Sequence, residues 1–450
     1  MSELPGGWSE TEIGPVNTYS SETLNPAKAP KQTFELYSVP VFAKRKPEIV
    51  DGKDIGSTKQ KVEPDDVLLC KINPRINRVW LVGKKNDHEQ IASSEWIVIR
   101  QPLFDPAFIR FQLQESSFRD RLCAEVSGVG GSLTRAQPKK VESYKLRIAP
   151  LAEQKRIAQK LDALLAQVDT LKARIDAIPA LLKRFRKSVV HSAVIGRLSA
   201  DLRVPIGKSE EQEQLGPLES WREVTLASLG ELSRGKSKHR PRNDSRLYGS
   251  AYPFIQTGDV ANSGGALTSS KVFYSEFGLK QSRLFPSGTL CITIAANIAD
   301  TAMLAIDACF PDSVVGFIPN KDDCIAQFIK YVIDDNKESL EALAPATAQK
   351  NINLKVLNQV KLRIPPIKEQ TEIVRRVEQL FAYADQLEAK VTAAQQRIDA
   401  LTQSLLAKAF RGELVPQDPS DEPASVLLER IRAQRAATPK PKRGRKAATS

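Results

Sequence analysis

The chain has 450 residues, 41% of them hydrophobic, which is enough for two or three domains that each bury a core. Its net charge of +13 indicates a polyanionic partner, although seven of these charges lie in residues 431–450, where no acid balances them. Five scattered cysteines without a CxxC spacing and only three histidines argue against a zinc site and favour a cytoplasmic protein. We expect neither a signal peptide nor a membrane span.

Residues 1–150 predict an α+β domain, the first front domain. Short runs rich in Val, Ile and Trp, punctuated by turn residues, predict strands at Val67–Ile72, Val79–Val82 and Trp96–Ile99. A short helix is expected at Pro106–Glu115.

Two segments of this domain carry side chains suited to DNA. Lys and Arg bind phosphates, whereas Arg, Asn and Gln read base edges. CKINPRINRVW (residues 70–80) mixes both classes, and GVGGSLTRAQPKK (residues 128–140) has glycines that let a backbone approach a phosphate closely. The alternative for the first segment is a polar strand edge. The candidate DNA-binding residues are Lys71, Asn73, Arg75, Asn77, Arg78, Thr134, Arg135 and Lys139.

Residues 151–198 predict a long helix, the central conserved region. From Ile157 to Val189 apolar residues recur in alternating steps of four and three, which is the a/d seam of a coiled coil. Pro179 lies inside this seam. Because the apolar phase continues beyond it, we expect a kink and not a break.

Residues 199–366 predict a second front domain, also α+β. Strands are expected at Thr289–Ile294 and Ala302–Ile306, and a helix at Ile325–Leu343. SRGKSKHRPRND (residues 233–244) is too rich in turn formers for a helix and is either a DNA-binding loop or a solvated charged loop. ATAQKNIN (residues 346–353) occupies the place of the glycine segment in the first domain. The candidate DNA-binding residues are Arg234, Lys236, Lys238, Arg240, Arg242, Gln349, Lys350 and Asn351.

The last helix repeats the first. RIAPLAEQKRIA (residues 147–158) recurs as RIPPIKEQTEIV (residues 363–374), and the offset of 216 holds without a gap through the distal conserved region, residues 367–414. Each seam finds its nearest complement in the other, so we expect the two helices to pack together. A parallel pair would need a long return connection, which favours an antiparallel coiled coil. A tail, residues 415–450, carries a short helix at Ala424–Ala433 and ends in a basic disordered segment.

The sequence contains no convincing set of catalytic residues. Asn73-Pro74-Arg75-Ile76 begins like the NPPY loop of an adenine methyltransferase but lacks its second proline and its aromatic residue. Walker motifs, nuclease-like carboxylate clusters and Ser-His-Asp arrangements are not apparent. We therefore predict no catalytic residue, no metal and no cofactor.

The repeated signatures at Pro150–Gln154 and Pro365–Gln370, with Ile178–Val189, Arg234–Val260 and Phe410–Ile431, resemble the specificity (S) subunit of Type I restriction–modification enzymes. In the first copy Ala149 stands where a double proline is usual. The resemblance implies two target-recognition domains that each read half of a bipartite site in double-stranded DNA. It also implies partner subunits: two methylation (M) subunits that bring S-adenosylmethionine and adenine methylation, and restriction (R) subunits that bring ATP-driven cleavage.

Two alternatives stay open at this point. A fragment of a bifunctional restriction–modification enzyme would need methyltransferase or nuclease motifs, which are not apparent. A coiled-coil DNA-binding scaffold without sequence specificity would not explain why the front domains diverged while the helices stayed similar.

Overall fold

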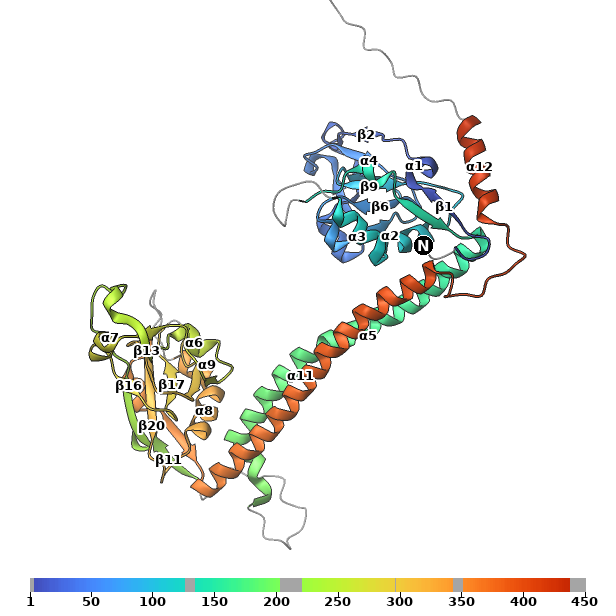
Figure 1. Cartoon of the computed structure of the whole chain (residues 1–450). Helices are drawn as coiled ribbons and strands as arrows, with labels where there is room; N and C mark the ends of the chain where they lie inside the picture. Colours follow the sequence, from blue (N-terminus) through green and yellow to red (C-terminus); the bar gives the residue numbers. More distant parts are fainter. Residues whose placement is uncertain (1–3, 126–133, 203–220, 296, 343–350, 438–450) are drawn as a thin grey trace, which may run out of the picture. The chain divides into compact units, whose positions relative to one another are not determined.

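The computed structural model consists of two compact units that share two long helices, α5 (Leu151–Val194) and α11 (Ile367–Phe410) (Figure 1). The first unit comprises residues 1–175 and 393–450, and the second comprises residues 176–392. The structure describes residues 4–125, 134–202, 221–295, 297–342 and 351–437. Within these residues, no helix combines the length and the apolar character needed to cross a membrane.

The front domain of the first unit is built on mixed sheets with short helices. Its strands are β1 (Ser9–Glu12), β2 (Thr23–Leu24), β3 (Thr33–Tyr37), β4 (Glu48–Asp51), β5 (Lys59–Lys61), β6 (Val67–Cys70), β7 (Val79–Leu81), β8 (Glu89–Ser93), β9 (Trp96–Ile99) and β10 (Lys145–Ile148). Its helices are α1 (Ile13–Val16), α2 (Pro106–Gln114), α3 (Ser116–Ala124) and α4 (Pro138–Val141). One sheet has the order β2-β5-β8-β3-β4 with β3 and β8 parallel, and a second has the antiparallel order β7-β6-β9.

The front domain of the second unit is built around one five-stranded sheet in the described residues. Its strands are β11 (Arg222–Thr225), β12 (Gly230–Arg234), β13 (Tyr248–Pro253), β14 (Ala266–Leu267), β15 (Phe273–Tyr274), β16 (Leu284–Phe285), β17 (Leu290–Thr293), β18 (Thr301–Leu304), β19 (Ala308–Cys309), β20 (Val314–Pro319) and β21 (Lys361–Ile364). Its helices are α6 (Thr257–Ala261), α7 (Glu276–Lys280), α8 (Ala326–Asp335), α9 (Lys337–Ala342) and α10 (Leu354–Asn358). The main sheet has the order β12-β20-β17-β18-β14.

The strands predicted from the sequence are present with ends that differ by at most two residues, and the predicted α+β class is confirmed. The helix expected at Ile325–Leu343 is instead two helices, α8 and α9. Asn336 separates them, and its Nδ2 donates to Val332 O at 2.8 Å. Because an Asn side chain competes for backbone hydrogen bonds, it favours the end of a helix over its interior.

Each front domain ends in a two-stranded antiparallel ribbon directly before its long helix. In the first unit β1 pairs with β10, and Ser9 lies opposite Ile148. In the second unit β11 pairs with β21, and Arg222 lies opposite Ile364. The internal repeat therefore includes the last strand of each domain as well as the helix.

In the first unit the Glu-Gln pair of the repeat ties the helix to the front domain. Trp8 Nε1 donates to Glu153 Oε2 at 3.1 Å. Gln154 Nε2 donates to Ala149 O at 2.8 Å, and its Oε1 accepts a hydrogen bond from Asp105 N at 2.9 Å. We call Trp8, Glu153 and Gln154 the first joint.

The second unit repeats this arrangement. Trp221 Nε1 donates to Glu369 Oε1 at 3.3 Å. Gln370 Nε2 donates to Pro365 O at 2.9 Å, and its Oε1 accepts from Ile325 N at 2.9 Å. Trp221, Glu369 and Gln370 form the second joint. The signatures that define the repeat are thus the side chains that fix each front domain to its helix.

The two long helices pack against each other in antiparallel fashion, as predicted (Figure 1). In the first unit Lys172 Nζ lies 2.7 Å from Asp399 Oδ1. In the second unit Arg186 Nη2 lies 2.5 Å from Asp385 Oδ1 and 2.9 Å from Glu388 Oε2. α5 continues through Pro179, so the proline does not break it.

The predicted seam forms most of this contact. Its buried members are Ile157, Leu161, Val168, Leu182, Val189, Ile373, Val377, Ala384 and Val391. Leu171 and Leu401 were also expected in the seam, yet they are 48% and 46% exposed. Two helices enclose less of each side chain than a larger bundle does, because no third helix covers the flanks of the seam.

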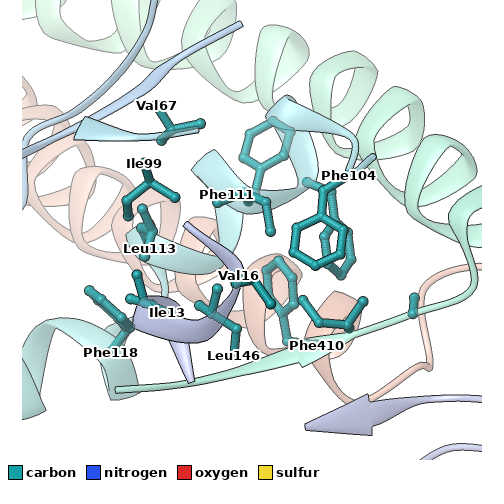
Figure 2. Close-up of a cluster of buried hydrophobic side chains, with 14 of the residues drawn as sticks. Ile13, Val16, Val67, Ile99, Phe104, Phe111, Leu113, Phe118, Leu146 and Phe410 are labelled. Atoms are coloured by element: carbon teal, nitrogen blue, oxygen red, sulfur yellow. The ribbon is translucent and has the colours of Figure 1, made fainter. Parts of the chain in front are cut away.

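The end of α11 enters the core of the first unit (Figure 2). Phe410 is fully buried there, and its ring lies edge-on to that of Phe108 with centroids 5.2 Å apart. The tail helix α12 (Ala424–Ala437) adds Leu427 to the same core. Arg156 of α5 holds the segment before α12 through an ion pair of 2.6 Å with Asp421.

The five cysteines all lie in described residues, and none forms a disulfide. Burial raises the pKa of the Cys70, Cys291, Cys309 and Cys324 thiols. These thiols are therefore parts of the packed core.

Candidate nucleic-acid interface

The first candidate surface lies where β6 ends. We define the first basic face as Lys71, Asn73, Arg75, Asn77, Arg78, Thr134 and Arg135. Asn73 N donates to Thr134 O at 3.0 Å, and Ala136 N donates to Lys71 O at 2.8 Å. The structure therefore brings together two segments that the sequence nominated separately.

The loop between β6 and β7 has a fixed shape. A 3-10 turn, Pro74–Ile76, is flanked by Asn73 and Asn77, which both have φ of +47°. Asparagine enters this left-handed region more easily than most residues. Arg75, at the centre of the turn, is exposed. The turn thus presents a cation at the end of the sheet.

The second basic face comprises Arg234, Lys236, Lys238, Arg240, Arg242 and Asn351. Arg234 is the last residue of β12 and lies opposite Val315, near the start of β20. β17 ends on the other side of β20. Asn351 forms an antiparallel bridge with Ala295, two residues after β17. The start of the basic loop and the end of the ATAQKNIN segment therefore meet at one edge of the sheet.

Hydrogen bonds hold the basic loop in place. Lys238 N donates to Gln281 O at 3.2 Å, and the Tyr248 hydroxyl donates to Arg242 O at 2.7 Å. The side chains of all five basic residues remain exposed. The predicted absence of a helix in this segment is confirmed.

Asp244 anchors the end of this loop. Its carboxylate bonds to Arg246 and to His239 Nε2, the latter at 2.7 Å. These bonds, that to Arg246 first, hold the pKa of the Asp244 carboxyl well below its usual range. The carboxylate is therefore ionised at neutral pH, and the loop retains this anchor.

The two faces have equivalent places in their domains. β6 pairs antiparallel with β9 in the first unit as β17 pairs with β20 in the second. Each face lies where the first strand of this pair ends. Lys139 lies outside the first face, on α4, where it is exposed. Gln349 and Lys350 lie outside the described residues.

Sequence reasoning missed an acid within the first basic face. Glu95 Oε1 lies 3.2 Å from Arg135 Nη2, and its Oε2 lies 3.9 Å from Lys71 Nζ. Asp312 has a similar place in the second face. A sequence signal would have required the pairing of β6 with β9, because nothing local links Glu95 to these cations.

Solved structures share the fold over nearly the whole chain. A chain from the structure described as "Structural basis underlying complex assembly and conformational transition of the type I R-M system" matches with a TM-score of 0.69 at 20% identity, covering 92% of this chain and 100% of that one. The HsdS subunit from Thermoanaerobacter tengcongensis matches with a TM-score of 0.60 at 21% identity, covering 92% and 98%. The fold is therefore that of a type I restriction–modification S subunit.

Sequence relatives give the family. The model of the "Type I restriction modification DNA specificity domain" family matches residues 218–394. The EcoKI specificity subunit of Escherichia coli K12 is 30% identical over 88% of this chain and 86% of its own length, and the EcoBI specificity subunit of Escherichia coli is 33% identical over 76% and 78%. The StySPI specificity subunit of Salmonella potsdam is 27% identical over 99% of both chains. The chain belongs to the family of Type I restriction enzyme specificity subunits. This confirms the resemblance seen in the repeated signatures and, with it, the prediction of a recognition subunit that is not itself an enzyme.

Proposed function

We propose that this chain selects the DNA sequence on which a Type I restriction–modification complex acts. Residues 1–150 and 199–366 each read one half of a bipartite site in double-stranded DNA through the first and second basic faces. Residues 151–198 and 367–414 dock two M subunits, and R subunits join the complex. The observation that carries this proposal is the duplication: two divergent domains each present a basic face at the end of an equivalent strand pair.

Substitution of the exposed residues Arg240 and Arg242 of the second basic face tests whether the second front domain reads its own half-site. Replacing both with Ala in the complex with the cognate M subunits should cost about 1–3 kcal/mol of discrimination at one base pair if either reads a base. If both bind phosphates, all sequences should weaken alike, and the salt dependence should flatten by about one unit of log–log slope for each arginine. Lys321→Ala, beyond the opposite end of β20, controls for the loss of a positive charge.

The measurement is affinity for a panel of single-base changes in both half-sites, at two salt concentrations. Altered preference confined to one half-site supports direct readout by the second face. A uniform loss with a flatter salt dependence assigns the loop to the DNA backbone. Altered preference in the other half-site, or unchanged binding and salt dependence, would show that this loop is wrongly assigned to the half-site read by the second front domain.

The proposal also predicts that the chain alone transfers no methyl group. Adding cognate M subunits should produce a complex of two M subunits per chain that methylates adenine in the bipartite site. Mass measurement of the complex and a methyl-transfer assay check both statements. Methylation by the pure chain would contradict the assignment.

A further inference from the structure

One carboxylate lies among the cations of the first basic face. Glu95 directly precedes β9, and β9 pairs with β6 so that Cys70 lies opposite Trp96. Lys71 N therefore donates to Glu95 O, at 3.0 Å. Only 24% of the Glu95 side chain is exposed.

This carboxylate contacts side chains from two segments that are distant in the sequence. Lys71 follows β6, whereas Arg135 lies more than sixty residues later, and both side chains contact Glu95. A carboxylate on a surface that approaches phosphates is repelled by them, so its presence there needs a compensating role. Hydrogen bonds and ion pairs to neighbouring cations fix the direction of long flexible side chains.

The second basic face contains the same kind of contact. Asp312 lies two residues before β20, the counterpart of β9. Arg234 donates through Nε and Nη2 to the backbone oxygen of Asp312, at 2.9 and 2.6 Å, and Arg242 Nη2 donates to Asp312 Oδ1 at 3.2 Å. Two domains with different sequences thus place an acidic residue against cations of the basic face at equivalent edges.

We propose that Glu95 is a positioning residue for sequence specificity, which holds Lys71 and Arg135 in the direction needed to meet the first half-site. Asp312 does the same for Arg242 in the second. This inference rests on the proposed function. Arg234 is held by a backbone oxygen, so a change of the Asp312 side chain releases only Arg242.

Removal of the charge has two consequences of opposite sign. Glu95→Gln removes a repulsive charge and weakens the hold on two cations by removing both ion pairs, so affinity for unrelated DNA should rise and its salt dependence should steepen by up to about one unit of slope. Because the cations lose their fixed direction, discrimination at the first half-site should fall about five- to tenfold. Partial unfolding of the domain would weaken both kinds of binding and cannot produce this combination.

The experiment uses the full chain in complex with its cognate M subunits. Affinities are measured for the bipartite site, for single-base changes in each half-site and for unrelated DNA, at two salt concentrations. Glu95→Asp should retain most of the discrimination. Glu48→Gln, on the edge strand β4 of the other sheet, removes the same charge away from the face and should leave discrimination unchanged.

A double-mutant cycle separates positioning from a general effect of charge. Arg135→Ala and Glu95→Gln should reduce discrimination non-additively, because both disrupt one contact. Full discrimination in Glu95→Gln would overturn the proposal even if unrelated DNA binds more tightly. A switch to another preferred base would also overturn it, since Glu95 would then read the base itself. If the unsubstituted complex shows no sequence preference, the proposed function fails first, independently of Glu95.

Discussion

Loss of the glutamine in one joint should destabilise one unit and leave the other unchanged. Gln154 is fully buried, and its amide serves both the carbonyl of Ala149 and the N–H of Asp105. Gln154→Ala leaves these two backbone groups without their partner at a site that water does not reach. An unsatisfied buried polar group costs about 1–3 kcal/mol, so the two together cost about 2–6 kcal/mol.

Hydrogen exchange measured peptide by peptide on the full chain resolves this effect. In Gln154→Ala, protection of β1, β10 and the first turns of α5 should fall at least about 30-fold, because a tenfold change corresponds to about 1.4 kcal/mol. Peptides of the second front domain act as an internal reference and should keep their protection. Gln370→Ala should give the mirror result.

The control is Gln167→Ala, which changes an exposed glutamine of α5. Exposed substitutions of this kind stay within about 0.5 kcal/mol. The reasoning is refuted if Gln154→Ala costs no more than this control, or if it lowers protection in both front domains alike. Either result would mean that the repeated Glu-Gln pair does not join helix and domain as the hydrogen bonds indicate.

Two further predictions concern the first unit. Phe410→Ala should destabilise the first unit by about 3–5 kcal/mol, because the ring is fully buried against Phe108. Hydrogen exchange of the β6 and β9 peptides measures this loss, and a loss below about 1 kcal/mol would contradict the prediction. Burial raises the pKa of the Glu153 carboxyl in the folded chain. The stability of the folded state therefore falls as the pH rises from the usual carboxyl pKa through the raised one, because the buried carboxyl must then ionise. Glu153→Gln still accepts from Trp8, and denaturation from about pH 4.5 to 7.5 should show its stability relative to the unsubstituted chain increasing with pH; a constant or falling difference would exclude this cause.

The helices and most strands followed from local patterns in the sequence. The four-and-three spacing from Ile157 onward depends only on which residues share a helix face, and that face is buried whichever partner covers it. The internal repeat then identified the partner of each helix as the other long helix. Local patterns did not predict where the seam changes. At the end of α11 the buried residues are Leu406, Ala409 and Phe410, because the helix there packs into the core of the first front domain as well as against α5.

The composition of the basic faces depends on contacts that no local pattern encodes. Lys71 and Arg135 were both nominated for their chemistry, but their convergence on Glu95 follows from the pairing of β6 with β9 and from residues 134–136 returning to the end of β6. Asp421 and the tail helix are held by Arg156 in the same non-local way. Such contacts join residues tens to hundreds of positions apart, where composition and periodicity carry no signal.

The positions of these contacts explain why the two copies could diverge unequally. Loss of a joint glutamine leaves buried backbone groups unsatisfied in the framework of a unit, so Gln154 and Gln370 cannot change without loss of stability. The basic faces lie on exposed loops beyond the strand ends, where most substitutions cost little stability. Under the proposed function, a new base preference can therefore arise at the faces while the joints and helices stay the same. If the faces read bases as we propose, Glu95 is a constraint that remains on the first face, because a cation that reads a base needs a fixed direction as well as a charge.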